Sequence, residues 1–176
     1  MAVRTIAALA VAGTTAGVIA LVPNTASAMP TDFDCTAGDM YTALVYGGAG
    51  AGNRYAAIQF TAKPDVTCTL PGALPVDLVG AHDVLIDNQA PADAPSVELS
   101  ADSPAYVPLH WTAIAAPDQQ QTPLAVTVTA PQEYNPRGDY SDPNISLTWP
   151  FSAVDTTPES HTIDVGAVTP GTAPAA

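Results

Sequence analysis

Leu124-Ala-Val-Thr-Val-Thr129 alternates apolar and polar residues, and Ile145-Ser-Leu-Thr-Trp149 repeats the alternation farther along the chain. Successive side chains of a β-strand point to opposite faces, so a period of two buries one face and exposes the other. The β-branched residues in both segments are also typical of strands. Both segments are therefore predicted to be strands with one face in a hydrophobic core.

The same alternation recurs in short segments that are separated by Pro, Gly, Asn and Asp, the residues typical of turns. After residue 28 no segment keeps apolar residues at helical spacing, and the chain's 18 prolines oppose long helices because proline lacks an amide hydrogen. We therefore predict an all-β domain, an immunoglobulin-like antiparallel β-sandwich over residues 35–168 with one disulfide. The predicted strands are 40–46, 55–62, 67–70, 76–79, 84–87, 96–99, 106–114, 124–129, 145–149 and 162–168.

The first residues have the three parts of a secretory signal peptide. Met1-Ala-Val-Arg4 carries one cation, residues 6–22 form an apolar run, and Ala26-Ser-Ala28 supplies the small residues of a cleavage site. Glycines and threonines interrupt the run, which makes a permanent membrane anchor the poorer interpretation. We predict that residues 1–28 are removed on export. The protein is then secreted, extracellular or associated with the cell envelope, with no stable membrane insertion after cleavage.

The remaining chain is predicted to hold one domain with short flexible ends. Residues 29–34 precede the first cysteine, and the tail 169–176 is rich in Pro, Ala and Gly, so both are expected to be flexible. The only two cysteines, Cys35 and Cys68, are expected to form a disulfide because exported domains fold in an oxidising environment. The chain-entropy treatment gives such a bridge about 3.5–4 kcal/mol of stabilisation.

The chain is strongly acidic, with 17 Asp and Glu against 4 Lys and Arg and a formal net charge of −13. Nucleic-acid binding is excluded, because it depends on Lys and Arg that neutralise phosphates. Anionic lipid surfaces repel such a chain for the same reason. A high net charge keeps an exported protein soluble. The alternative interpretation is that some of the carboxylates gather a divalent cation.

No catalytic constellation is recognised in the sequence, so we predict that the protein is not an enzyme. A reactive serine in a Gly-x-Ser-x-Gly elbow does not occur. The glycine-rich segment 47–53 lacks the Lys-Ser/Thr pair and the following helix of a phosphate-binding loop, so it is predicted to be a hairpin loop. A glycosidase-like pair of carboxylates from separate strands stays open as an alternative, since such pairs need no fixed spacing.

Two weaker hypotheses concern metals, although the primary prediction has no cofactor and no metal ligand. His82, His110 and His161 lack metal-ligand spacing, but histidines from separate strands can meet as zinc ligands. Calcium at a loop is the other hypothesis, without the length and order of an EF-hand loop. The candidate calcium clusters are Asp139-Tyr-Ser-Asp142 and the group Asp83, Asp87 and Asn88.

The aromatic residues fall into a core group and a loop group. Trp111 and Trp149 lie in predicted strands among alternating apolar residues, so core packing is their expected role. His110 should then point to the opposite face of its strand. Residues 131–143 form a long loop, and loops at the end of a sandwich often carry binding. The possible binding residues in this loop are Tyr134, Asn135, Arg137 and Tyr140, since tyrosine and arginine suit recognition.

Several short motifs occur together in this chain. They are a cysteine soon after the leader, Thr67-Cys-Thr-Leu-Pro-Gly72, Pro75-Val-Asp-Leu78 and an apolar strand ending at Trp111. This combination resembles a secreted actinobacterial family, domain of unknown function 4232 (DUF4232), over nearly the whole mature chain. The resemblance implies an extracellular or envelope-associated β-sandwich with Cys35 and Cys68 bridged, and it implies no particular activity.

The function predicted from these observations is that of an exported, non-enzymatic β-sandwich. It would act as a binding or structural module at the cell envelope or in the extracellular space, toward an envelope or extracellular ligand that the sequence does not identify. The alternatives are a secreted hydrolase with acidic catalytic residues and a calcium-stabilised extracellular module.

Overall fold

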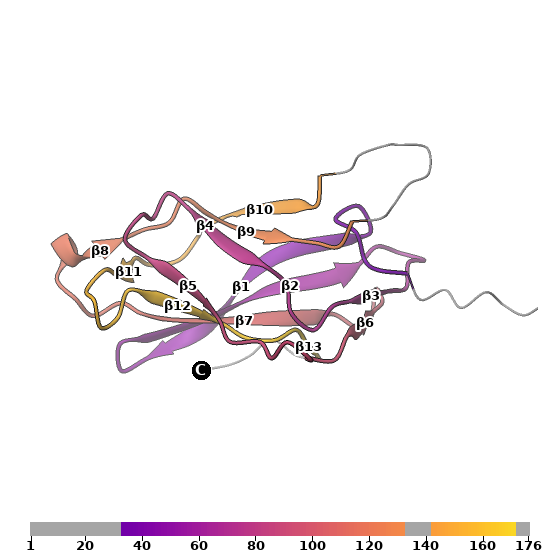
Figure 1. Cartoon of the computed structure of the whole chain (residues 1–176), viewed down its shortest axis with the longest axis horizontal. Coiled ribbons are helices and arrows are strands. Elements are labelled where there is room, and N and C mark those ends of the chain that lie inside the picture. The colour runs from indigo at the N-terminus through magenta and orange to yellow at the C-terminus, as the bar shows by residue number, and fades with distance from the viewer. Residues whose placement is uncertain (1–32, 133–141, 172–176) are drawn as a thin grey trace, which may run out of the picture.

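The computed structural model describes residues 33–132 and 142–171, and within them the regular structure is β-strand apart from one short 3-10 helix (Figure 1). All ten predicted strands are present, with ends that differ by a few residues. Three further strands, β8, β11 and β13, are two residues long, too short for an alternation to reveal. The elements are β1 (Met40–Gly50), β2 (Asn53–Ala62), β3 (Cys68–Leu70), β4 (Val76–Val79), β5 (Leu85–Asn88), β6 (Val97–Leu99), β7 (Ala105–Thr112), η1 (Pro117–Gln119), β8 (Gln120–Gln121), β9 (Ala125–Thr129), β10 (Asn144–Thr148), β11 (Val154–Asp155), β12 (Thr162–Val165) and β13 (Thr169–Pro170).

The longer strands form two sheets that face each other (Figure 1). The larger sheet has the order β1-β2-β7-β12-β5, with β13 also paired to β7, and the smaller sheet has the order β10-β9-β4. The pairs β3–β6 and β8–β11 lie toward opposite ends of the molecule (Figure 1). The strand pairs are antiparallel except β5–β12, which is parallel. The predicted all-β sandwich is confirmed, and this parallel pair makes the larger sheet a mixed one.

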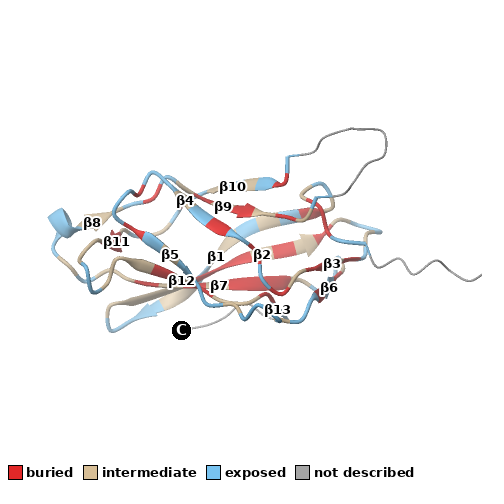
Figure 2. Cartoon of the chain, viewed as in Figure 1, coloured by how far each residue is buried: buried red, intermediate tan, exposed pale blue. Residues whose placement is uncertain are grey.

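The hydrophobic core fills the space between the two sheets (Figure 2). The central strand β7 contributes Val107, Leu109 and Trp111, each 1% exposed. The ring centroid of Trp111 lies 5.0 Å from that of Trp149 and 5.7 Å from that of Phe151, so the three rings form one aromatic cluster. Such contacts add to the free energy gained by burying the rings. The predicted core role of both tryptophans is confirmed.

The predicted disulfide between Cys35 and Cys68 is confirmed, and both residues are buried. Backbone hydrogen bonds reinforce the link, because the Cys35 amide donates to the Thr69 carbonyl at 2.9 Å and Asp34 forms a bridge with Thr69. At the other end, β13 pairs with β7. Regular pairing therefore extends beyond the predicted domain bounds of 35 and 168, into residues that the sequence assigned to flexible ends.

The glycine of the Pro-Gly72 motif is required by a close approach of two chain segments. A Cβ atom at Gly72 would lie 2.4 Å from the carbonyl oxygen of Ala94, which is a backbone atom and has little freedom to move. The carbonyl of Gly72 also accepts a hydrogen bond of 2.8 Å from the Val168 amide. This glycine therefore lets the segment after β3 pack against the segments before β6 and after β12.

Candidate functional site

The four residues predicted for a binding loop, Tyr134, Asn135, Arg137 and Tyr140, lie outside the described residues. Of the predicted Asp139–Asp142 calcium cluster, Asp142 is described. Its Oδ1 accepts hydrogen bonds from the backbone amide and the side-chain amide of Asn144, at 2.9 and 3.0 Å. These hydrogen bonds hold the start of β10. The rest of the cluster, residues 139–141, lies outside the described residues, so calcium binding there stays a prediction.

The three histidines do not come together. His82 and His161 line one open cavity of about 410 Å³ with Asp83, whereas His110 lines a different cavity. Asp83 is engaged with Gln121, whose Nε2 donates to its Oδ2 at 2.6 Å. Within residues 33–132 and 142–171, no three His, Cys, Asp or Glu side chains gather closely enough to hold a metal ion. The zinc hypothesis is therefore wrong for these three histidines as a set.

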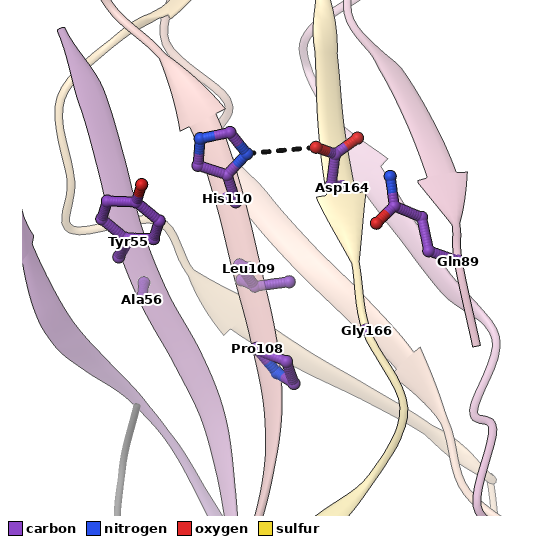
Figure 3. A pocket seen from close by; sticks show the side chains of 8 residues that line it. All are labelled: Tyr55, Ala56, Gln89, Pro108, Leu109, His110, Asp164 and Gly166. Atoms are coloured by element: carbon purple, nitrogen blue, oxygen red, sulfur yellow. Dashed lines mark hydrogen bonds and ion pairs between the residues drawn. The ribbon is translucent and has the colours of Figure 1, made fainter. Parts of the chain in front are cut away.

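The strongest candidate site lies on the outer face of the larger sheet, where three strands place polar side chains side by side (Figure 3). Tyr55 of β2 is the register partner of His110 of β7, and His110 is the partner of Asp164 of β12. His110 points outward because its neighbours Leu109 and Trp111 are buried in the core, and side chains alternate along a strand. The predicted orientation of His110, opposite to Trp111, is confirmed.

His110 connects the three strands through its ring. Its Nδ1 lies 3.1 Å from Oδ2 of Asp164, and its Nε2 lies 2.9 Å from Oδ1 of Asn53. A neutral imidazole donates to one of these two oxygens, and a protonated one donates to both. The ring also stacks on Tyr55, with 4.9 Å between the centroids and 28° between the planes. The side chains of His110 and Asp164 are 35% and 34% exposed, so a ligand in solvent can reach both.

A cavity of about 240 Å³ lies beside this group. Pro108 and Gly166 line it, and glycine is required there because a Cβ at Gly166 would lie 2.6 Å from Cγ of Pro108. Gln89, which follows β5, lines the cavity beyond Asp164, and its amide group points toward β12 (Figure 3). Nε2 of Gln89 donates to Oδ2 of Asp87 at 3.3 Å, which leaves its Oε1 as the acceptor for a ligand.

Asp155 forms a second polar centre, which the sequence did not indicate. It is fully buried, and its Oδ1 accepts hydrogen bonds from the backbone amides of Ile114 and Ala115, both at 3.0 Å, and from Nε2 of Gln120 at 2.9 Å. Burial raises the pKa of this carboxyl, but these hydrogen bonds together with one from Thr112 outweigh it and lower the pKa below its ordinary value. Asp155 is therefore a structural anion that ties the segment after β7 to β11.

The comparisons with known proteins identify the family. A model of the family described as a domain of unknown function (DUF4232) matches residues 35–169, and the chain belongs to this family. The match begins at the first cysteine and ends in β13, so it covers the whole disulfide-linked sandwich. No curated protein matches the chain. No solved structure matches it.

The disulfide is the structural observation that bears on the compartment. In the part of the chain that the structure describes, no helix is long and apolar enough to cross a membrane. The Cys35–Cys68 disulfide is of the kind found in proteins that fold in an oxidising compartment. The disulfide is compatible with the predicted extracellular location.

Proposed function

We propose that the protein is a secreted, non-enzymatic binding module that holds its ligand in the cavity beside His110 and Asp164. The observation that carries this proposal is the fixed group of Tyr55, His110 and Asp164 on the outer face of the larger sheet. Central strands position these side chains, which are half-exposed and have hydrogen-bonding groups and an aromatic ring available to a ligand. Such a combination of apolar lining and a few oriented polar groups is what small-ligand sites share.

The chemistry of the cavity favours binding over catalysis. The residues that line it include no serine, threonine, cysteine or lysine, so the remaining candidates for a nucleophile or base are Tyr55, His110 and Asp164, and the last two are hydrogen-bonded to each other. The cavity is open to solvent, whereas many active sites are enclosed, because excluding bulk water strengthens the electrostatic interactions that stabilise a transition state. The leader-like residues 1–28 and the disulfide support export of the module to the envelope or the extracellular space.

The proposal is tested by mapping ligand contacts. The ¹⁵N-labelled protein is titrated with solubilised envelope glycans and with peptides released from cell-surface proteins, and the backbone amide shifts are followed by NMR. We expect the shifts to centre on β7 and β12, and Tyr55→Ala to weaken binding. Tyr41→Ala is the matched control, because Tyr41 is 60% exposed on β1 and does not line the cavity. Shifts that avoid the cavity, or equal effects of the two variants, would refute the assignment of the site.

A second candidate function is a hydrolase that uses a pair of acidic residues. The observation in its favour is the register of the parallel strands, which places Asp164 of β12 directly beside Asp87 of β5. Paired carboxylates of this kind serve as acid and base or nucleophile in glycoside cleavage. The test is release of reducing sugar from envelope glycans by the wild type and by Asp87→Asn. Activity that Asp87→Asn abolishes would favour the hydrolase, and absence of release by the wild type would exclude it for those substrates.

A further inference from the structure

We infer that the cavity beside His110 and Asp164 takes a cationic group on a short apolar stem, that is, a guanidinium or a primary ammonium. This inference rests on the proposed function, because it names the ligand class of the same site. It follows from the hydrogen-bonding atoms, the charge and the lining of the cavity.

Two acceptor oxygens, one of them on a carboxylate, remain available at the β12–β5 side of the cavity. Oδ2 of Asp164 is engaged with His110, and Oδ1 of Asp164 accepts no hydrogen bond from the described residues. Nε2 of Gln89 gives one of its two N–H groups to Asp87, so Oε1 and the second N–H of Gln89 remain available. Guanidinium and ammonium groups carry several N–H donors and no acceptor, so they can donate to both Oδ1 of Asp164 and Oε1 of Gln89. A neutral hydroxyl has a single donor, and its hydrogen bond to the carboxylate is charged on one side only.

The negative charge around the cavity also favours a cationic ligand. Asp164 lines the cavity and Asp87 lies beside it in register, so two carboxylates are adjacent on the outer face. The described residues contain only two Lys or Arg, Arg54 and Lys63, and neither lines the cavity. Arg54 donates instead to the backbone carbonyl of Asn53 at 3.0 Å. The net charge of the chain, −13, adds a long-range attraction for a positive ligand.

The rest of the lining suits an apolar stem. The ring of Pro108 and the backbone at Gly166 lie next to the polar wall, and Leu109 and Ala56 also contribute. The Tyr55 ring lines the cavity from β2 and offers further apolar surface there, while one of its faces is stacked on His110. A volume of about 240 Å³ is below the range of pockets for whole drug-sized ligands and fits one side chain or one small amine.

The test rests on a pair of ligands, an arginine and a citrulline peptide, that differ in charge and hardly in shape. The ¹⁵N-labelled protein is titrated with acetyl-Gly-Gly-Arg-Gly-Gly-amide, with the same peptide carrying citrulline in place of arginine, with its lysine counterpart and with free agmatine. We expect the arginine peptide to shift the amides of Gln89, His110, Asp164 and Gly166. The citrulline peptide should bind at least about tenfold more weakly, as expected for loss of a charge-assisted hydrogen bond. Agmatine that binds as tightly as the peptide would identify the free small cation as sufficient.

Two variants separate the site from the general charge of the protein. Asp164→Asn keeps an oxygen acceptor for His110 and should weaken binding of the arginine peptide about tenfold or more. Asp77→Asn is the matched control, because it removes the same charge from β4 of the other sheet, where Asp77 is exposed. An amide spectrum with the same dispersion as that of the wild type confirms that each variant is folded.

The possible outcomes distinguish this inference from the proposed function. Equal affinity for the arginine and citrulline peptides, or equal losses in the two variants, would overturn the cationic ligand class. If neutral glycans shift the cavity amides and the cationic probes do not, the ligand class is wrong and the binding module stands. If neither the cationic probes nor the envelope ligands shift these amides, both proposals fail.

Discussion

The buried carboxylate of Asp155 is predicted to be the polar group on which the fold depends most. Its side chain is fully buried, and its Oδ1 accepts hydrogen bonds from the amides of Ile114 and Ala115 and from Gln120, while Oδ2 also accepts from the Ile114 amide. These donors belong to the segment that leaves β7 and to β8, so Asp155 fixes one end of the sandwich. Removal of the side chain leaves three donors without this acceptor.

Asp155→Ala should lower the free energy of unfolding by about 3–5 kcal/mol. An unsatisfied buried donor costs about 1–3 kcal/mol, and part of the cost is relieved where water reaches the exposed Ile114. The loss is large beside the net stability of about 5–15 kcal/mol of a typical domain, so Asp155→Asn serves as a milder variant. It keeps one oxygen acceptor and should lose about 1–2 kcal/mol. Urea unfolding followed by tryptophan fluorescence measures both, and Asp118→Ala, at an exposed position of η1, is the matched control.

The reasoning about Asp155 also predicts a pH dependence. Hydrogen bonds outweigh burial and lower the pKa of the Asp155 carboxyl in the folded protein below the ordinary value of 3.8. The Asp155 carboxyl therefore binds its proton less tightly in the folded protein than in the unfolded chain. The stabilisation is therefore fully present above the unfolded pKa and is lost as the pH falls through the folded one. The difference in unfolding free energy between wild type and Asp155→Asn should shrink below about pH 4. A difference that stays constant from pH 7 to pH 3, or an Asp155→Ala loss no larger than that of Asp118→Ala, would refute the reasoning.

Three further predictions concern the disulfide, a close approach and the core. Replacing Cys35 and Cys68 together by alanine should lower the free energy of unfolding by about 3.5–4 kcal/mol, and equal urea midpoints for this variant and the oxidised wild type would contradict that. Gly72→Ala should lower the free energy of unfolding by about 1–3 kcal/mol, because the new Cβ would meet backbone atoms within 2.5 Å. Gly50→Ala is the control and should be neutral, because no atom lies within 4 Å of a Cβ there, and thermal melts of both variants make the comparison. Trp111→Ala should cost about 3–5 kcal/mol by urea unfolding, and a loss below about 1 kcal/mol would show that its burial contributes little.

The sequence predicted the strands well, because their signal is local. Alternation placed Leu109 and Trp111 in the core and His110 outside, as observed. The pieces that it missed have no local signal. Gln120–Gln121 is uniformly polar and becomes a strand only because Val154–Asp155 pairs with it from more than thirty residues away. The parallel pairing of β5 and β12 likewise depends on contacts between distant segments, which no periodicity in a single strand reveals.

The candidate site could be predicted only in part, for a related reason. His110 was recognised as an outward-facing residue, but its partners Asn53 and Asp164 lie 57 and 54 residues away in the sequence. The registers of β2 and β12 against β7 bring these two residues to either side of His110. The loop predicted to bind, which contains Tyr134 and Arg137, lies outside the described residues and stays a prediction.

The position of the site within the sheet has a consequence for binding. β2, β7 and β12 each have a paired strand on both sides, so none of the three strands that carry the site is an edge. A slip of one residue in β7 would exchange His110 with the buried Trp111, and the cost of exposing that core residue fixes the register. The side chains of the cavity are therefore already placed when a ligand arrives. Binding then costs little conformational entropy in these side chains, so even a small cavity on this face can bind a single side chain selectively.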